Sequence, residues 1–123
     1  MRRQPCYKLN HRFEYKKIPS LAQSTGRTGW YYRVIEEGDV QAGHEMILIE
    51  RINPWWSVSR VQHFAYKEIN NTEACAEISE LLGLSEFFID LFKKRLTDGV
   101  EDMSGRLNGD EAVFWRPYKL VEN

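Results

Sequence analysis

Two stretches in the first half of the chain are rich in apolar, aromatic and β-branched residues. Residues 30–35 end at a turn-forming run at 37–39, and residues 46–52 begin shortly after Gly43. In the second stretch, apolar side chains occupy both alternating faces, which is typical of a strand buried on both sides. The pattern therefore predicts two neighbouring strands of a β-barrel.

The residues before these stretches are less regular. Residues 2–17 are basic and aromatic with weak periodicity, which indicates an irregular loop with at most one short strand. Residues 19–26 are predicted to form a short helix, because Pro19 suits a first helical turn and Gly26 suits a helix end.

From residue 54 onward the apolar residues have helical spacing. Ser57 is a suitable N-cap for a first helix, and Asn71 or Thr72 for a second. Ser85 is predicted to cap a third helix, and Gly83 to stop the second. Short amphipathic helices bury their apolar stripes against one another. The predicted core consists of Phe64, Ile78, Leu82, Phe88, Leu91 and Phe92, with Leu96 on the same stripe of the third helix.

The order of elements predicts an α+β chain, in which a partial β-barrel of few strands and one short helix precedes a three-helix domain. We place the barrel part at 1–53, the helical domain at 54–107 and a tail at 108–123. The tail has a turn at Asn108 and Gly109 and a candidate strand at 112–121. Two or three strands cannot close a barrel or cover both faces of a buried strand. We therefore expect the chain to be a fragment that needs further strands as partners.

Composition narrows the functional class. With 123 residues, 42% of them hydrophobic, the chain has the composition of a globular protein. Its net charge of -1 gives no excess of positive charge that would attract nucleic acid. No apolar run approaches the roughly 20 residues of a membrane span. The only cysteines, Cys6 and Cys75, have dissimilar surroundings and are predicted to be free thiols in a reducing compartment, so we expect a cytoplasmic protein.

Cys6 is the candidate for chemistry. Basic residues at positions 2, 3, 8 and 12 are its neighbours in the sequence, and cations favour the thiolate, which binds soft metals. A buried small hydrophobe after Pro5 is the structural alternative. The sequence has no CxxC or HExxH pair, so a zinc site made by the protein alone is not expected. One thiolate can still ligate a metal whose other ligands come from a cofactor. Cys75 lies on an apolar helical stripe and is predicted to be core.

Arg27 lies in a second basic turn. It stands between Gly26 and Gly29, a pattern that fits either an anion-binding turn or the end of the preceding short helix. The residues alone leave both interpretations open.

Three motifs resemble those of bacterial MOSC proteins of the hydroxylaminopurine-reductase type. They are residues 4–13, around Cys6, residues 25–34, around Arg27, and residues 38–43. Residues 57 to about 106 resemble the three-helix "3-alpha" domain that follows MOSC in such proteins, and residues 114–121 resemble, more weakly, the opening of a flavin-binding reductase module. Two departures stand out, since the first barrel strands of the family are missing and His44 replaces a usually acidic residue.

The resemblance implies a β-barrel that binds the molybdenum cofactor, with Cys6 as molybdenum ligand and catalytic residue. It also implies reduction of N-hydroxylated bases and related compounds to amines, a detoxification, with electrons from a flavin or iron–sulfur reductase. We expect Lys8 and Arg27 to bind the anionic groups of the cofactor. The alternatives are a non-catalytic helical interaction module, and a MOSC domain that carries the cofactor or transfers sulfur. We expect the isolated chain to be inactive without the missing strands.

Overall fold

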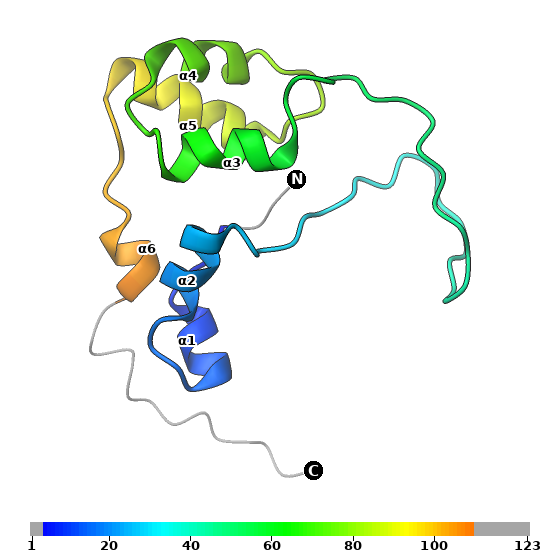
Figure 1. Ribbon diagram of the computed structural model, residues 1–123, viewed down its shortest axis with the longest axis horizontal. Coiled ribbons are helices and arrows are strands. Elements are labelled where there is room, and N and C mark those ends of the chain that lie inside the picture. The colour runs from blue at the N-terminus through cyan, green and yellow to red at the C-terminus, as the bar shows by residue number, and fades with distance from the viewer. Residues whose placement is uncertain (1–3, 110–123) are drawn as a thin grey trace. The chain divides into compact units, whose positions relative to one another are not determined.

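The computed structural model describes residues 4–109, which contain six helices (Figure 1). The helices are α1 (Lys8–Phe13), α2 (Ile18–Thr25), α3 (Val58–Tyr66), α4 (Thr72–Ser79), α5 (Glu86–Thr97) and α6 (Ser104–Asn108). The described chain divides into two compact units, one of residues 29–100 and one of residues 4–28 with 101–109. The predicted strand at 112–121 lies outside the described residues. The domain boundaries predicted from the sequence stay a prediction.

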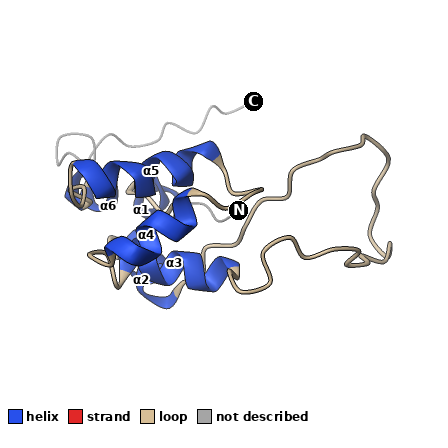
Figure 2. Cartoon of the chain, turned by 90° about the horizontal axis from the view of Figure 1, so that it is seen from above, coloured by secondary structure: helices blue, strands red, loops and turns tan. Residues whose placement is uncertain are grey.

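The predicted α+β class with a partial β-barrel is wrong for the described residues, which form helices and loops but no strand (Figure 2). Both predicted strands, 30–35 and 46–52, lie in a loop whose residues 30–52 are all exposed; we call it the exposed segment. A strand is stabilised by hydrogen bonds to neighbouring strands, and an isolated pair of strands is only marginally stable in water. Because the described chain supplies no further strand, the apolar pattern alone does not produce a sheet.

The unit that contains residues 4–28 also differs from its prediction. Residues 8–13, predicted to be irregular, form α1, which ends where Glu14 adopts a left-handed conformation with φ 51°. The helix predicted at 19–26 is confirmed as α2, with proline in its first turn and Gly26 left-handed at its C-cap. Gly26 therefore ends a helix, as one of the two interpretations of this turn proposed.

The three N-caps predicted for the helices after residue 54 are confirmed. The Ser57 hydroxyl accepts a hydrogen bond from the backbone N–H of Arg60 at 3.1 Å, which caps α3. The side-chain oxygens of Asn71 and Ser85 accept the equivalent bonds at the starts of α4 and α5. Each bond satisfies an N–H group that a helix start leaves without a partner in the helix.

The end of α4 differs from the prediction. The helix ends at Ser79 and not at Gly83, because the backbone N–H groups of Glu80 and Leu81 bond back in tight turns. This turn takes Leu82 off the apolar stripe, and its side chain is 73% exposed. The prediction of Leu82 as a core residue is therefore wrong.

The core of residues 29–100 lies between α3, α4 and α5. Ile78 on α4 and Phe92 on α5 are fully buried, and Phe64 and Leu91 pack against the cluster, as predicted. Leu96 is exposed, whereas its neighbour Arg95 is buried. The Arg95 guanidinium donates to the backbone carbonyls of Phe64 and Ala65 at 3.0 and 2.8 Å, so it ties the end of α3 to α5.

Phe88→Ala is expected to destabilise the helical unit by about 3–5 kcal/mol, because it removes a buried ring and leaves a cavity. Phe88 is 4% exposed, whereas the adjacent Phe87 is 51% exposed. Phe87→Ala is therefore the matched control and should change stability by no more than about 0.5 kcal/mol. Urea unfolding of the full chain followed by far-UV circular dichroism measures both. Equal unfolding midpoints in the two variants would contradict the packing described here.

Candidate functional site

Cys6 lies in the short loop that leads into α1. Its thiol is free and half-buried, and the preceding Pro5 is buried. The Cys6 carbonyl accepts a hydrogen bond from the Leu9 N–H at 3.0 Å, and the Tyr7 carbonyl accepts one from the Asn10 N–H at 2.9 Å. The loop and the first turn of α1 therefore form one hydrogen-bonded structure.

Residues 101–109, which we call the return segment, belong to the same compact unit as the Cys6 loop. The backbone carbonyl of Arg106 accepts a hydrogen bond from the Tyr7 N–H at 2.8 Å. The Arg106 guanidinium donates to the Pro5 carbonyl at 2.5 Å and to Oε1 of Gln23, on α2, at 2.7 Å. One residue of the return segment thus contacts the residues on both sides of Cys6.

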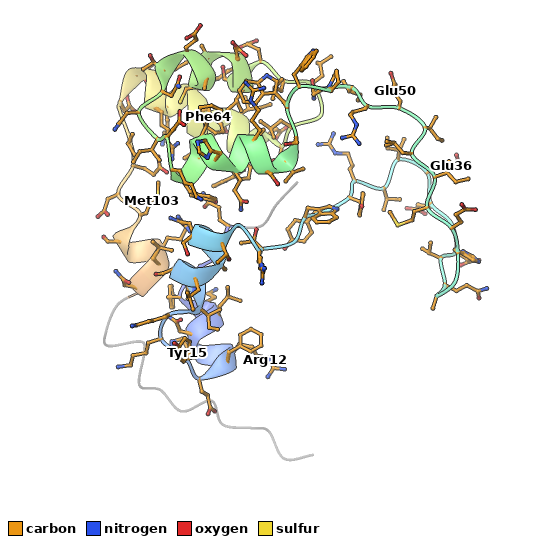
Figure 3. The ribbon with its side chains drawn as sticks, in the orientation of Figure 1. Arg12, Tyr15, Glu36, Glu50, Phe64 and Met103 are labelled. Carbon is orange, nitrogen blue, oxygen red and sulfur yellow. The ribbon has the colours of Figure 1, made fainter. Side chains whose placement is uncertain are left out.

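Two further contacts hold the return segment. The amide of Gln23 donates from Nε2 to the sulfur of Met103, which Figure 3 labels just before α6, at 3.7 Å. The carboxylate of Asp102 accepts from the backbone N–H of Ser104 at 2.8 Å and from its hydroxyl at 2.7 Å. These bonds, the backbone one first, lower the pKa of Asp102. The start of α6 is therefore fixed both locally and to α2.

Lys8 and Arg27, the predicted cofactor-binding residues, are both exposed. Lys8 is the first residue of α1, two positions after Cys6, and Arg27 directly follows the turn that ends α2. Among the residues described, neither makes a hydrogen bond or ion pair with Cys6. The structure thus places all three predicted residues in one compact unit without joining them, and their predicted roles stay predictions.

Asn10 is a polar residue of this site that the sequence analysis missed. It lies one helical turn after Cys6 and is 3% exposed. Its side-chain oxygen Oδ1 is buried and accepts no hydrogen bond from any residue in 4–109. A buried acceptor of this kind calls for a donor, because desolvation without a hydrogen bond is costly. Its place in the Cys6 motif was the available signal, whereas nothing local pointed to Arg106.

Metal ligands supplied by the protein alone are not grouped in the described part of the chain, where no cluster of three or more His, Cys, Asp or Glu side chains occurs. His63 instead bonds Glu68 at 2.7 Å on the surface and thereby lowers the pKa of that carboxyl group. Cys75 is 2% exposed in the helical core, as predicted. Within 4–109, no helix is long and apolar enough to cross a membrane.

Comparison with known proteins identifies the N-terminal part of the chain. Residues 1–47, which include Cys6, Lys8 and Arg27, match the MOSC domain family. The chain is 34% identical to protein YiiM of Escherichia coli over 108 residues, which are 87% of this chain and 48% of that protein. Residues 1–47 are therefore similar to the MOSC domain, and the chain is similar to part of YiiM.

A solved structure and a second relative show similarity over most of the chain. The crystal structure of YiiM from Escherichia coli matches 87% of this chain with a TM-score of 0.81 and 33% identity, over 53% of the YiiM chain. A protein named "Reductase" from Gibberella moniliformis is 36% identical over 94 residues, which are 76% of this chain and 17% of that protein. The chain therefore spans about half the length of the YiiM relatives and a smaller share of the Gibberella protein.

Proposed function

We propose that this chain is part of a MOSC-type, molybdenum-cofactor-dependent oxidoreductase that reduces N-hydroxylated bases or related N-hydroxy compounds to amines. The observation that carries the proposal is the MOSC match over residues 1–47, in which the half-buried thiol of Cys6 occupies a loop fixed by hydrogen bonds. The relative named "Reductase" favours an oxidoreductase over a purely structural module.

The residues around Cys6 fit a metal held mainly by an organic cofactor. One soft thiol stands without a cluster of other protein ligands in the described residues, so the remaining ligands would come from the cofactor. The buried Oδ1 of Asn10 would accept a hydrogen bond from the cofactor. The exposed cationic side chains of Lys8 and Arg27 would bind its anionic groups.

The reaction is a two-electron reduction in which the N–O bond breaks. The hydroxylamine, two electrons and two protons give the amine and water, and a flavin or iron–sulfur reductase supplies the electrons. The bound cofactor supplies the oxygen-atom transfer chemistry. The residues of this chain would hold and orient the cofactor, and Cys6 would provide the sulfur ligand of its metal.

The rest of a MOSC domain is the proposed partner of the exposed segment. The YiiM relatives are about twice as long as the part that this chain matches. A match over 87% of the chain must include part of residues 30–52, since the other residues are too few to account for it. This agreement supports a backbone path that becomes a sheet once the missing part supplies neighbouring strands.

The proposal is tested with a chimera that joins this chain to the part of Escherichia coli YiiM that it does not cover. The chimera is purified from cells that make the molybdenum cofactor, and its metal content and its reduction of a hydroxylaminopurine are measured. We expect near-stoichiometric molybdenum and formation of the amine. Cells grown without molybdate provide the control, which should give inactive protein.

Each other outcome points to one of the alternatives. Molybdenum without turnover would favour a cofactor carrier or sulfur-transfer role. A folded chimera with neither molybdenum nor turnover would refute the proposal and leave a helical interaction module.

A further inference from the structure

We propose that Arg106 and Gly109 are positioning residues for Cys6, and that the return segment fixes the thiol for metal ligation. The inference rests on the proposed role of Cys6 as a ligand. It assigns a task to residues that lie about a hundred positions away along the chain.

Arg106 contacts the Cys6 loop through both its backbone and its side chain. Its carbonyl accepts from the Tyr7 N–H, and its Nη1 donates to the Pro5 carbonyl. The residues before and after Cys6 are therefore bound to the same residue. A loop held at both flanking peptides keeps the backbone of Cys6, and with it the direction of the Cα–Cβ bond, in place, since local opening requires both bonds to break.

The shape of the guanidinium explains why arginine suits this position. Nη2 bonds Gln23 on α2 at 2.7 Å while Nη1 bonds Pro5, so one rigid planar group joins the loop to a helix. A lysine ammonium carries the same charge but lacks this fork of fixed donors. Gln23 in turn uses its other amide atom on Met103, which secures the return segment to the same helix.

Gly109 allows the end of α6 to lie against the ring of Tyr7. Its φ is +68°, and a Cβ atom there would lie 2.6 Å from Cγ of Tyr7 and 2.8 Å from Cδ2. Any other residue would have to displace the tyrosine that directly follows Cys6, in addition to adopting a strained backbone. Gly105, in the same helix, has open space around its Cβ direction and serves as a matched control.

Alkylation of the full chain by iodoacetamide tests the proposal, because the two cysteines report on different parts of the molecule. Cys6 is half-buried beside the return segment, whereas Cys75 is buried in the helical core. Peptide mass spectrometry gives a separate rate for each thiol. The reagent is uncharged, so the charge of the protein does not attract or repel it, and Gly109→Ala tests the loop with no change in charge.

We expect Arg106→Met and Gly109→Ala each to accelerate labelling of Cys6 on the order of tenfold. Arg106→Met loses the side-chain bonds to Pro5 and Gln23, and Gly109→Ala displaces the ring of Tyr7, so both changes loosen the loop. Arg106→Lys should give a smaller acceleration. Arg33→Met removes a charge from the exposed segment and Gly105→Ala adds a methyl group to open space, so both should label at the original rate. Labelling of Cys75 should stay slow in every variant.

Unchanged Cys6 labelling in either Arg106→Met or Gly109→Ala would overturn the proposal. Equal acceleration at Cys75 would overturn it too, because the residue would then support the whole chain and not the loop. The assay contains no cofactor, so its failure is distinct from failure of the proposed function. In the chimera, loss of molybdenum from Cys6→Ser with full retention in Arg106→Met would also contradict a positioning role.

Discussion

The 123-residue chain expressed alone is expected to contain no molybdenum and to reduce no N-hydroxy substrate. The reason is the exposed segment, which presents large apolar side chains to solvent, and Ile49 alone is 95% exposed. Figure 1 shows this part of the chain, coloured from cyan to green, as a loop outside α3, α4 and α5, and Figure 3 labels Glu36 and Glu50 on it. The other exposed side chains include Tyr32, Val34, Ile35, Val40, Met46, Ile47 and Leu48.

The exposed segment needs to be buried against another part of a protein, for two physical reasons. Contiguous apolar side chains in water favour association, and an extended backbone without a neighbouring strand offers N–H and C=O groups for pairing with another chain. Cofactor sites also bury most of their ligand, which the Cys6 loop and short helices cannot do alone.

The measurement compares the chain with the YiiM chimera described above. Light scattering should find the chain oligomeric and the chimera monodisperse, and elemental analysis should find molybdenum only in the chimera. A charged substitution such as Ile49→Lys should make the chain alone more soluble without restoring molybdenum. A soluble monomer of the unaltered chain with stoichiometric molybdenum and turnover would disprove the claim that the exposed segment must be buried by further strands.

Cys6→Ser in the chimera is expected to lower molybdenum-dependent turnover by more than about 100-fold. Loss of outer groups that only support a metal ligand already costs about 10–100-fold, so loss of the ligand itself should cost more. The change from thiol to hydroxyl alters little volume, which keeps the packing of the loop, but it removes the soft donor that the metal prefers. The fold should be unchanged by circular dichroism, because the helical core lies in the other compact unit.

Cys75→Ala is the matched cysteine control for this experiment. It removes the other thiol of the described residues, which is buried among Ile78 and its neighbours in the core. We expect a loss of stability with turnover retained by the folded fraction. Full turnover in the Cys6→Ser chimera would rule out Cys6 as the metal ligand, whatever the effect of Cys75→Ala.

The sequence by itself determined the features that depend on neighbouring residues. Each N-cap at Ser57, Asn71 and Ser85 requires only a side-chain oxygen and an N–H three positions later, so local chemistry was sufficient to predict it. The end of α2 at Gly26 is also set locally, since glycine has no side chain and adopts the left-handed conformation easily. The motif around Cys6 was equally local.

Only the tertiary structure decided the features that depend on distant residues. Residues 30–35 and 46–52 have the apolar pattern of strands, but a sheet also requires neighbouring strands, which the described chain does not supply. Burial of Arg95 depends on carbonyl groups about thirty positions earlier, at the end of α3. Arg106 reaches the Cys6 loop across nearly the whole chain, and no local pattern signals that contact. Side-chain periodicity reports which face of an element is apolar, whereas the fold decides what covers that face.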